Sequence, residues 1–369
     1  MNHVFIVLML VLGSFAQAVA QPVELISPQR QSFSPAKGEH YALAIRVGDK
    51  DRVKRMSADI RTSDDDLIAT LVPIQDKKAP NMYTVVWDGK DSNGQIVPDE
   101  AYHPVINIEF EQSEDHVLDF RKTSGGEEVY DFEKQILPGI IEYTLPVDSR
   151  VIVRAGIKNG PMLRTVIDWE PRTKGLHLER WNGQDVDHLF SVEKQPNVGY
   201  LIMGYKLPDH SIITYGNKKQ TYREYRESKH LPIKQVSYEN RLLDRNGVII
   251  RPEYYQAVLQ QKSPRIDVAL INRQTKERVN VVPPLGEVMV KVNIHEIDEI
   301  YLDQERYEIS FFVDNEFISE EEQGFVPFTW RWSPGKHGID PGSHVLTVNV
   351  SGYKGQVGVR NIPFTIIEE

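Results

Sequence analysis

The run Asp91-Ser92-Asn93-Gly94 is the stretch of the sequence that most resembles a metal site, because Ca²⁺ prefers carboxylate and amide oxygens. If Glu100 were the twelfth ligand position of a calcium loop, the first would fall on Gly89, which has no side-chain oxygen. The flanking patterns are also strands rather than helices. We therefore interpret the run as a turn whose side chains bond the local backbone. No metal ligand is predicted, although a weak calcium site near Asp91 stays open, and Asp64-Asp65-Asp66 is interpreted as a solvated loop.

Catalytic signatures are absent from the sequence. It contains no His-Glu-x-x-His, Gly-x-Ser-x-Gly or phosphate-binding loop, and without cysteine it has no thiol nucleophile or thiolate zinc site. Ser34-Pro-Ala-Lys37 and Ser351-Gly-Tyr-Lys354 fit Ser-x-x-Lys but lack its companion motifs. We predict no catalytic residue, no cofactor and no enzyme. A β-rich hydrolase with carboxylates from distant strands remains an alternative.

Three aromatic residues, Phe328, Trp330 and Trp332, share one parity and therefore one face of a predicted strand. We interpret them as packing in a sandwich core or at its rim, where each ring buries a large area. If that face were exposed, the rings would instead form a platform for stacking sugars. A carbohydrate-binding accessory module is therefore the alternative function.

The segment 217–262 differs from the rest of the chain. It carries a net charge of +5 within a chain of net charge −10, together with five of the sixteen tyrosines. Tyr and Arg are enriched at protein interfaces. The segment is therefore predicted to contact a protein partner with an acidic surface, or alternatively to be a linker or extra strands packed on the second sandwich. The candidate contact residues are Tyr222, Arg223, Tyr225, Arg226, Tyr254 and Tyr255.

The elements that would position these residues are strands, because the apolar pattern repeats every two residues. Leu43, Ile45 and Val47 alternate with polar or small residues, and the same pattern recurs along the chain. Turn signals such as Lys158-Asn-Gly-Pro161 separate the runs. The fold class predicted is all-β, with tandem immunoglobulin- or fibronectin-like β-sandwiches and very little helix. One short helix is expected after Pro252.

An internal repeat indicates the number of domains. Tyr83-Thr-Val-Val-Trp87-Asp-Gly-Lys-Asp91 corresponds to His177-Leu-Glu-Arg-Trp181-Asn-Gly-Gln-Asp185, and an aromatic strand follows each. The first copy resembles the immunoglobulin-like domain of the flagellar hook-capping protein (FlgD-like) in its W-D-G-x-D-x-N-G…Y run. The second copy keeps Trp181, Gly183 and Asp185 but has Asn182 for Asp88, and Glu179 stands where the first copy has Val85. The resemblance implies the fold and an exported protein, not a flagellar role.

A third sandwich is predicted towards the C-terminus. The order F-x-V-D, P-F-x-W-x-W and G-x-H-x-L, which starts at Phe311, Pro327 and Gly342, resembles a bacterial immunoglobulin-like domain. Domains of that family serve more often as spacers than as ligand-binding modules. The predicted divisions are 1–20 (signal peptide), 21–111 and 112–216 (FlgD-like sandwiches), 217–262 (basic Tyr-rich connecting segment) and 263–369 (bacterial immunoglobulin-like sandwich).

The first twenty residues predict export. An apolar run from Val4 to Leu12 precedes Ala18-Val-Ala20, which is typical of a signal peptide cleaved after Ala20. We expect a periplasmic or extracellular protein with no membrane span after cleavage. The acidic net charge disfavours nucleic acid as a partner. The predicted function is non-catalytic: binding or scaffolding of other proteins in a bacterial cell-envelope or surface assembly.

Overall fold

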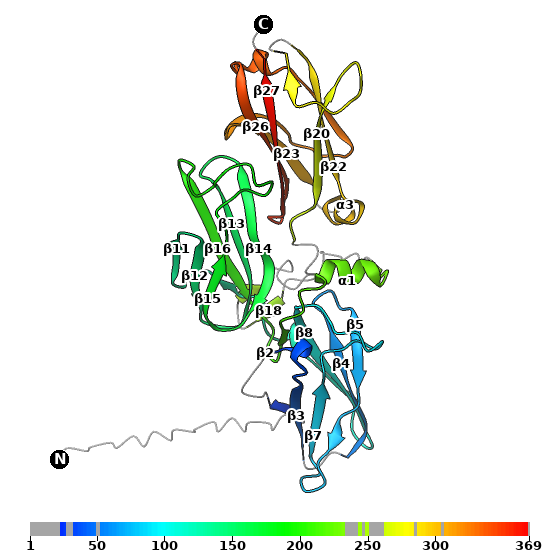
Figure 1. Cartoon of the computed structure of the whole chain (residues 1–369). Helices are drawn as coiled ribbons and strands as arrows, with labels where there is room; N and C mark the ends of the chain where they lie inside the picture. The colour runs from blue at the N-terminus through cyan, green and yellow to red at the C-terminus, as the bar shows by residue number, and fades with distance from the viewer. Residues whose placement is uncertain are drawn as a thin grey trace, which may run out of the picture.

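The computed structural model describes residues 23–26, 32–48, 52–232, 243–245, 248–250, 262–283, 286–303 and 306–367. Within them the chain forms three β-sandwiches, with the first at the bottom of Figure 1, the second beside and above it, and the third at the top. The predicted all-β class of immunoglobulin- or fibronectin-like sandwiches is confirmed. The predicted signal peptide, residues 1–20, lies outside the described residues.

The first sandwich is built from two sheets that share one core. Its strands are β1 (Val23–Ile26), β2 (Ser32–Phe33), β3 (Tyr41–Val47), β4 (Val53–Arg61), β5 (Leu67–Leu71), β6 (Ile74–Gln75), β7 (Met82–Trp87), β8 (Ala101–Phe110), β9 (His116–Asp119) and β17 (Ile212–Thr214). One sheet has the order β1-β3-β7-β6, and the other β2-β17-β8-β4-β5, with β9 on β8. Two 3-10 helices, η1 (Pro35–Lys37) and η2 (Phe120–Lys122), complete the unit.

The core of the first sandwich follows from the alternation in the sequence. Leu43, Ile45 and Val47 on β3 are all buried in one cluster with Trp87 and Tyr102. The rings of Trp87 and Tyr102 meet edge to face with their centroids 5.1 Å apart, the geometry that the ring quadrupoles favour. The predicted core face is therefore the observed one.

The second sandwich has strands β10 (Glu128–Val129), β11 (Lys134–Leu137), β12 (Ile140–Leu145), β13 (Ser149–Ile157), β14 (Met162–Arg172), β15 (Gly175–Arg180) and β16 (Val198–Lys206). One sheet has the order β10-β16-β13-β14 and the other β11-β12-β15. Every second residue of β13, from Val151 to Ala155, is buried in the core with Trp181.

The second sandwich is inserted into the first, and this corrects the predicted boundaries at 111/112 and 216. Strand β9 still pairs with β8 of the first sandwich. After β16 the chain returns, and β17 pairs with Tyr102 of β8 on one side and with Phe33 of β2 on the other. A three-residue strand carries no periodicity that would assign it to a sheet. Two connections, 123–127 and 207–211, therefore join the two sandwiches.

The third sandwich has strands β20 (Ile266–Asn272), β21 (Val281–Val282), β22 (Val288–Ile294), β23 (Tyr307–Val313), β24 (Glu316–Glu321), β25 (Phe328–Trp332), β26 (Gly342–Gly352) and β27 (Val357–Ile366), and the 3-10 helix η4 (Pro334–His337). Its sheets have the orders β20-β22-β25 and β21-β27-β26-β23-β24. All of these strands lie within the predicted range 263–369.

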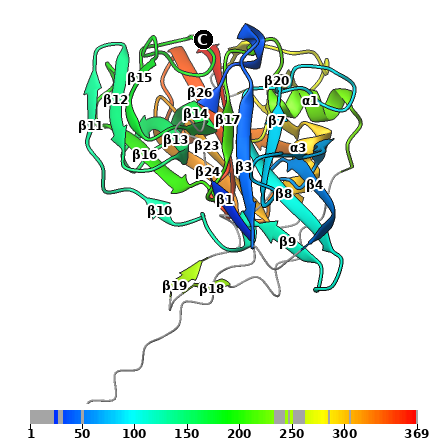
Figure 2. The same cartoon turned by 90° about the horizontal axis from the view of Figure 1, so that it is seen from below.

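In the described part of the chain, two short helices lie between the first and third sandwiches. Helix α1 (Tyr222–Ser228) begins with a capping box, in which Thr221 and Glu224 each accept a hydrogen bond from the other's backbone N–H. Helix α3 (Glu296–Asp303) precedes β23. The two helices are close together in both views (Figures 1 and 2). The helix expected after Pro252 lies outside the described residues. Before it, the structure describes a hairpin of β18 (Leu243–Arg245) and β19 (Val248–Ile250).

Among the described residues, the long strands β8 and β13 are buried on both faces over most of their length. In an isolated sandwich one face of each strand would meet solvent. Here the second face meets a neighbouring unit or a connection between units, as where Arg150 of β13 pairs with Glu100 next to β8, and where the His103 ring of β8 contacts Ser211. The two strands therefore lie at the junctions between the sandwiches.

Candidate functional site

The two Trp-x-Gly-x-Asp turns have the same geometry. Trp87 Nε1 donates to the carbonyl of Lys90 at 2.9 Å, and Trp181 Nε1 donates to that of Gln184 at 3.0 Å. The glycine between each pair, Gly89 or Gly183, has a φ of +72° or +71°, which disfavours any residue with a Cβ. The internal repeat seen in the sequence is therefore a repeat of structure.

The aspartate of the first turn contacts helix α1. Asp91 Oδ1 accepts the backbone N–H groups of Asn93 and Gln95, both at 2.9 Å. Its Oδ2 lies 2.8 Å from Lys229 Nζ and accepts the Tyr225 hydroxyl at 3.0 Å. Burial acts to raise the pKa of Asp91, but the bonds from Lys229 and the Gln95 amide outweigh it and lower the pKa. The Asp91 oxygens are thus occupied by local amides and by the cation of α1.

The aspartate of the second turn contacts the third sandwich in the corresponding way. Asp185 Oδ1 accepts the N–H groups of Leu189 at 2.7 Å and Phe190 at 2.9 Å. Its Oδ2 accepts Asn361 Nδ2, from β27, at 2.9 Å. In both repeats Oδ1 orders the turn and Oδ2 bonds a group outside it; in the second turn Oδ2 also accepts the Asp187 N–H at 3.0 Å.

The predicted partner-contact residues of α1 are mostly buried within the chain, and this corrects that prediction. Tyr222, Tyr225 and Arg226 are 3–4% exposed. Arg223 bonds Ser263 at 3.2 Å and is 3.4 Å from Asp298. Their side chains have the area and the donors of interface residues, but the interface lies between units of one chain. Tyr254 and Tyr255 lie outside the described residues.

Arg226 lies at the centre of a buried polar cluster. Its Nε is 2.7 Å from Asp66 Oδ2 on the β4–β5 loop, and its Nη1 donates to the Tyr301 hydroxyl on α3 at 3.1 Å. Asp66 also accepts the Tyr222 hydroxyl at 2.8 Å. The loop predicted to be solvated is therefore partly interior: Asp64 and Asp66 are each 4% exposed. Burial raises the pKa of Asp64 to about 6, although Arg226 opposes the shift.

The junction between the first and second sandwiches contains a buried ion pair. Arg150 Nη1 lies 2.7 Å from Glu100 Oε1, and both side chains are at least nine-tenths buried. Beside it the His103 ring lies within hydrogen-bond distance of Ser63 and Ser211. Burial, with nearby Arg121 and Arg150, holds the pKa of His103 well below its ordinary value. Glu100, which would have been the twelfth position of a calcium loop, thus forms a salt bridge between the first and second sandwiches.

At the junction between the second and third sandwiches, the side-chain amide of one residue bonds both backbone groups of another, as a paired strand would. Asn349 accepts the Met162 N–H at 2.8 Å and donates to the Met162 carbonyl at 3.0 Å. Nearby, Arg360 lies 2.6 Å from Asp187. A side-chain amide can satisfy both groups of a backbone unit in this way. These polar contacts fix how the two sandwiches meet.

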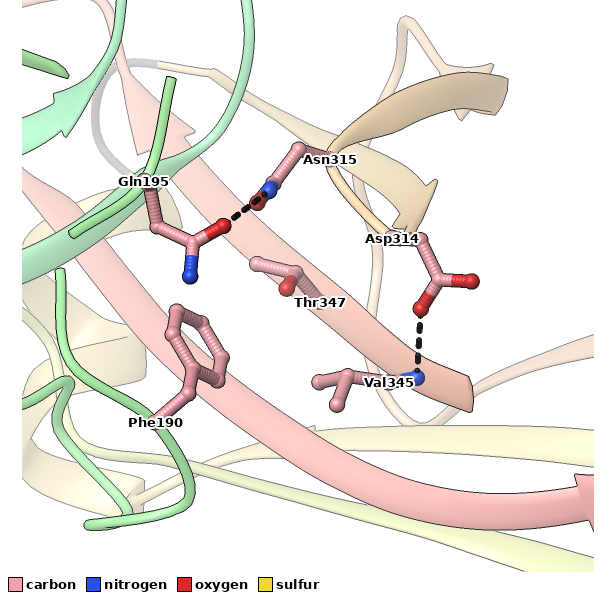
Figure 3. Close-up of a pocket in the computed structure, with 6 residues that line it drawn as sticks. All are labelled: Phe190, Gln195, Asp314, Asn315, Val345 and Thr347. Atoms are coloured by element: carbon pink, nitrogen blue, oxygen red, sulfur yellow. Dashed lines mark hydrogen bonds between the residues drawn. The ribbon is translucent and has the colours of Figure 1, made fainter. Parts of the chain in front are cut away.

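A cavity of about 240 Å³ opens at this second junction (Figure 3). Phe190 and Gln195 line it from the second sandwich, and Asp314, Asn315, Val345 and Thr347 from the third. Asn315 donates to Gln195 at 3.1 Å, and Asp314 accepts the Val345 N–H at 2.9 Å, so these groups bond each other. The cavity is a cleft of the junction between the second and third sandwiches.

The aromatic strand of the third sandwich faces inward. Phe328 and Trp332 belong to the core, and Trp330 packs against it partly buried. The core interpretation is confirmed. The sugar-stacking alternative required these rings to be exposed together, and they are not.

The described residues show neither a metal-binding cluster nor a helix that could span a membrane. There, no group of three or more His, Cys, Asp or Glu is arranged to hold a metal ion. In the same residues, no helix has the length and apolar character needed to cross a bilayer.

No sequence pattern indicated the junction residues Glu100, Asp185, Asn349 and Asn361 directly. One signal was available in β13, where Arg150 and Arg154 alternate with buried Val151 and Val153. A strand with apolar residues on one face and arginines on the other, flanked by further apolar residues, indicates a second buried face.

No family model matches the chain, and no curated protein does. Among solved structures, the chain is similar to fibronectin(III)-like modules of Clostridium thermocellum CbhA, with 9% identity over 94% of each chain and a TM-score of 0.21. It is similar to a Ca²⁺-stabilised adhesin with which an Antarctic bacterium binds ice, with 10% identity over 96% of this chain and 75% of that one and a TM-score of 0.20. The FN1–FN3 domains of chicken CNTN1 match at 12% identity over 89% of this chain and 94% of that one, with a TM-score of 0.19. At these scores the likeness carries no argument about function, and the sandwich fold rests on the sheets themselves.

Proposed function

We propose that the chain is a rigid, non-catalytic scaffold that binds other proteins in a bacterial cell-envelope or surface assembly. The signal-like residues 1–20, with cleavage after Ala20, support a periplasmic or extracellular location. The matching Trp-x-Gly-x-Asp turns support grouping the first two sandwiches with the FlgD-like immunoglobulin-like domains.

The observation that carries this proposal is that every pair of sandwiches is joined by buried polar contacts. Glu100–Arg150 joins the first and second, and Asp185–Asn361 joins the second and third. Between the first and third, Arg226 of α1 contacts both Asp66 of the first sandwich and Tyr301 of α3, the helix that precedes β23. Buried charged hydrogen bonds fix a register because any other register would leave them unpaired. Flexible spacers do not need such contacts. A protein that holds partners at a set geometry does.

A partner surface is offered by β15 on the second sandwich. Leu176 and Leu178 point outward from this strand and are 60% and 56% exposed. Within the described residues β15 pairs only with β12, so its other edge is open. Paired apolar side chains on an open edge favour binding of an extended segment of another protein.

The test is crosslinking in intact cells followed by mass spectrometry. A variant with Leu176→Lys and Leu178→Lys is expected to lose crosslinks to its partner while it keeps its fold. The matched control is Val72→Lys, which places one lysine at a 79% exposed position on the first sandwich. If the β15 variant keeps every crosslink of the wild type, the partner does not bind at this face. If the wild type crosslinks to no protein, the scaffold proposal fails.

A further inference from the structure

Arg154, in the middle of β13, is a buried cation whose charge no carboxylate contacts among the described residues. The side chain is 4% exposed. Its Nη1 donates to the Gly355 carbonyl at 2.5 Å, while its Nε and Nη2 have no hydrogen-bond partner in the described part of the chain. The nearby carboxylate of Asp168 accepts instead from the backbone N–H and hydroxyl of Ser263. Burial lowers the pKa of Arg154, and Asp168 only partly opposes this.

Arg150 is a buried arginine on the same strand that does have a carboxylate partner, so the lack of one among the described residues is particular to Arg154. Arg150 lies on the same strand and the same face and is 6% exposed. It pairs with Glu100 at 2.7 Å and donates to the Trp169 carbonyl at 3.0 Å. A buried charge without a counter-charge is strongly unfavourable, so such groups are usually paired. The missing counter-charge of Arg154 is therefore the feature to be explained.

Arg154 lines a cavity of about 290 Å³ at the end of β13 and β16. Gly156 and Gly199 are opposite each other across the two strands, and the backbone of Pro161 and Met162 and the side chain of Lys158 pack closely against them. A second cation, Lys158, is exposed at the cavity, which Leu201 and Pro161 line with apolar surface. The site thus combines two cations and apolar surface.

We propose that this cavity binds a small organic carboxylate. The carboxylate takes the place of the missing counter-charge between Arg154 and Lys158, because a guanidinium offers paired donors that match two carboxylate oxygens. The body of the ligand rests against Leu201 and Pro161. The cavity volume is many times the roughly 30 Å³ of one water and close to the lower end for small-molecule sites, which favours an organic anion over a bare ion. This site is independent of the proposed scaffold role.

The experiment measures ligand-induced thermal stabilisation and binding calorimetry on the full chain at constant ionic strength. The probes are sodium benzoate and sodium glucuronate, with benzyl alcohol and glucose as neutral counterparts and sodium sulfate as a bare anion. The wild type is expected to bind at least one carboxylate and neither neutral counterpart. Arg154→Met is expected to weaken that binding at least tenfold, and Lys158→Met to weaken it less. Lys174→Met removes the same charge from an exposed position elsewhere on the second sandwich and is expected to leave binding unchanged.

Arg154→Met is expected to fold, so a loss of binding in this variant reports on the site. Without ligand, Arg154→Met is expected to melt at or above the wild-type temperature, because it removes an unpaired buried charge. A lower melting temperature would show that the chain itself satisfies Arg154, and would overturn the proposal. The proposal also fails if no carboxylate binds, if Arg154→Met binds as well as the wild type, or if sulfate binds as tightly as both organic anions.

Discussion

Removal of the Arg226 guanidinium is the perturbation that tests the junction cluster most sharply. Arg226→Met keeps the length of the side chain but removes the donors that contact Asp66 and Tyr301. The Arg226 and Asp66 side chains are 5% and 3% exposed, so the loss leaves buried carboxylates uncompensated. Breaking a buried pair in this way costs about 3–5 kcal/mol. That decrease is expected in the free energy of the first unfolding transition.

The assay is urea unfolding followed by tryptophan fluorescence at pH 7.5 and pH 5. The loss is expected to be smaller at pH 5, because without Arg226 the already raised pKa of Asp64 rises further and protonation neutralises one buried charge. Lys218→Met is the control, since Lys218 is exposed and such changes are usually within about 0.5 kcal/mol. The reasoning is refuted if Arg226→Met behaves like Lys218→Met, or if its loss is the same at both pH values.

The remaining predictions concern the cores, the turns and pH. Trp87→Ala and Trp181→Ala should each destabilise one sandwich by about 3–5 kcal/mol in urea unfolding, with no difference on adding a chelator; a strong chelator effect would revive the calcium interpretation. Asn361→Ala should cost about 1–3 kcal/mol, because it leaves Asp185 Oδ2 short of a donor, and should increase hydrogen exchange at the second junction but not in the cores. Because Asp64 has a raised pKa in the folded state, the folded protein binds the extra proton between about pH 4 and 6, so its contribution to stability falls as pH rises through this window. The stability of the wild type relative to Asp64→Asn should therefore increase by about 1–2 kcal/mol from pH 7 to pH 5; an unchanged difference would contradict the assignment.

Much of the fold could be predicted because its signals are local. Alternation such as Leu43-x-Ile45-x-Val47 defines a strand face without reference to any partner strand. The Trp-x-Gly-x-Asp repeat likewise encodes a turn that closes on itself through bonds within a few residues. Both kinds of pattern appear in the structure as expected.

The role of helix α1 could not be predicted from composition. Tyrosine and arginine identify interface chemistry, but the residue types do not tell whether the other side of the interface is a second protein or the same chain. Tyr222 meets Asp66, which is 156 residues away in sequence. Only the fold brings such groups together, and the same holds for β17 and its place in the first sandwich.

The two repeats differ where the second has Glu179 in place of Val85, and the structure explains this difference. Glu179 replaces the apolar Val85 of the first copy on an inward-facing position. Its Oε1 lies 2.6 Å from Arg172 Nε and accepts the Tyr143 hydroxyl at 2.9 Å. Burial acts to raise the pKa of Glu179, but these bonds outweigh it and lower the pKa. The carboxylate is tolerated there because its partners come from neighbouring strands.

The central claim, that the three sandwiches form one rigid scaffold, is tested most directly by a distance distribution between the first and third sandwiches. The chain has no cysteine, so Lys78→Cys and Gln274→Cys, both at exposed positions, give a doubly spin-labelled protein without other changes. Pulsed electron paramagnetic resonance is expected to show a single narrow distance distribution. Arg226→Met in the same doubly labelled protein is expected to give a broader distribution. A broad or multi-peaked distribution in the wild type would contradict the claim.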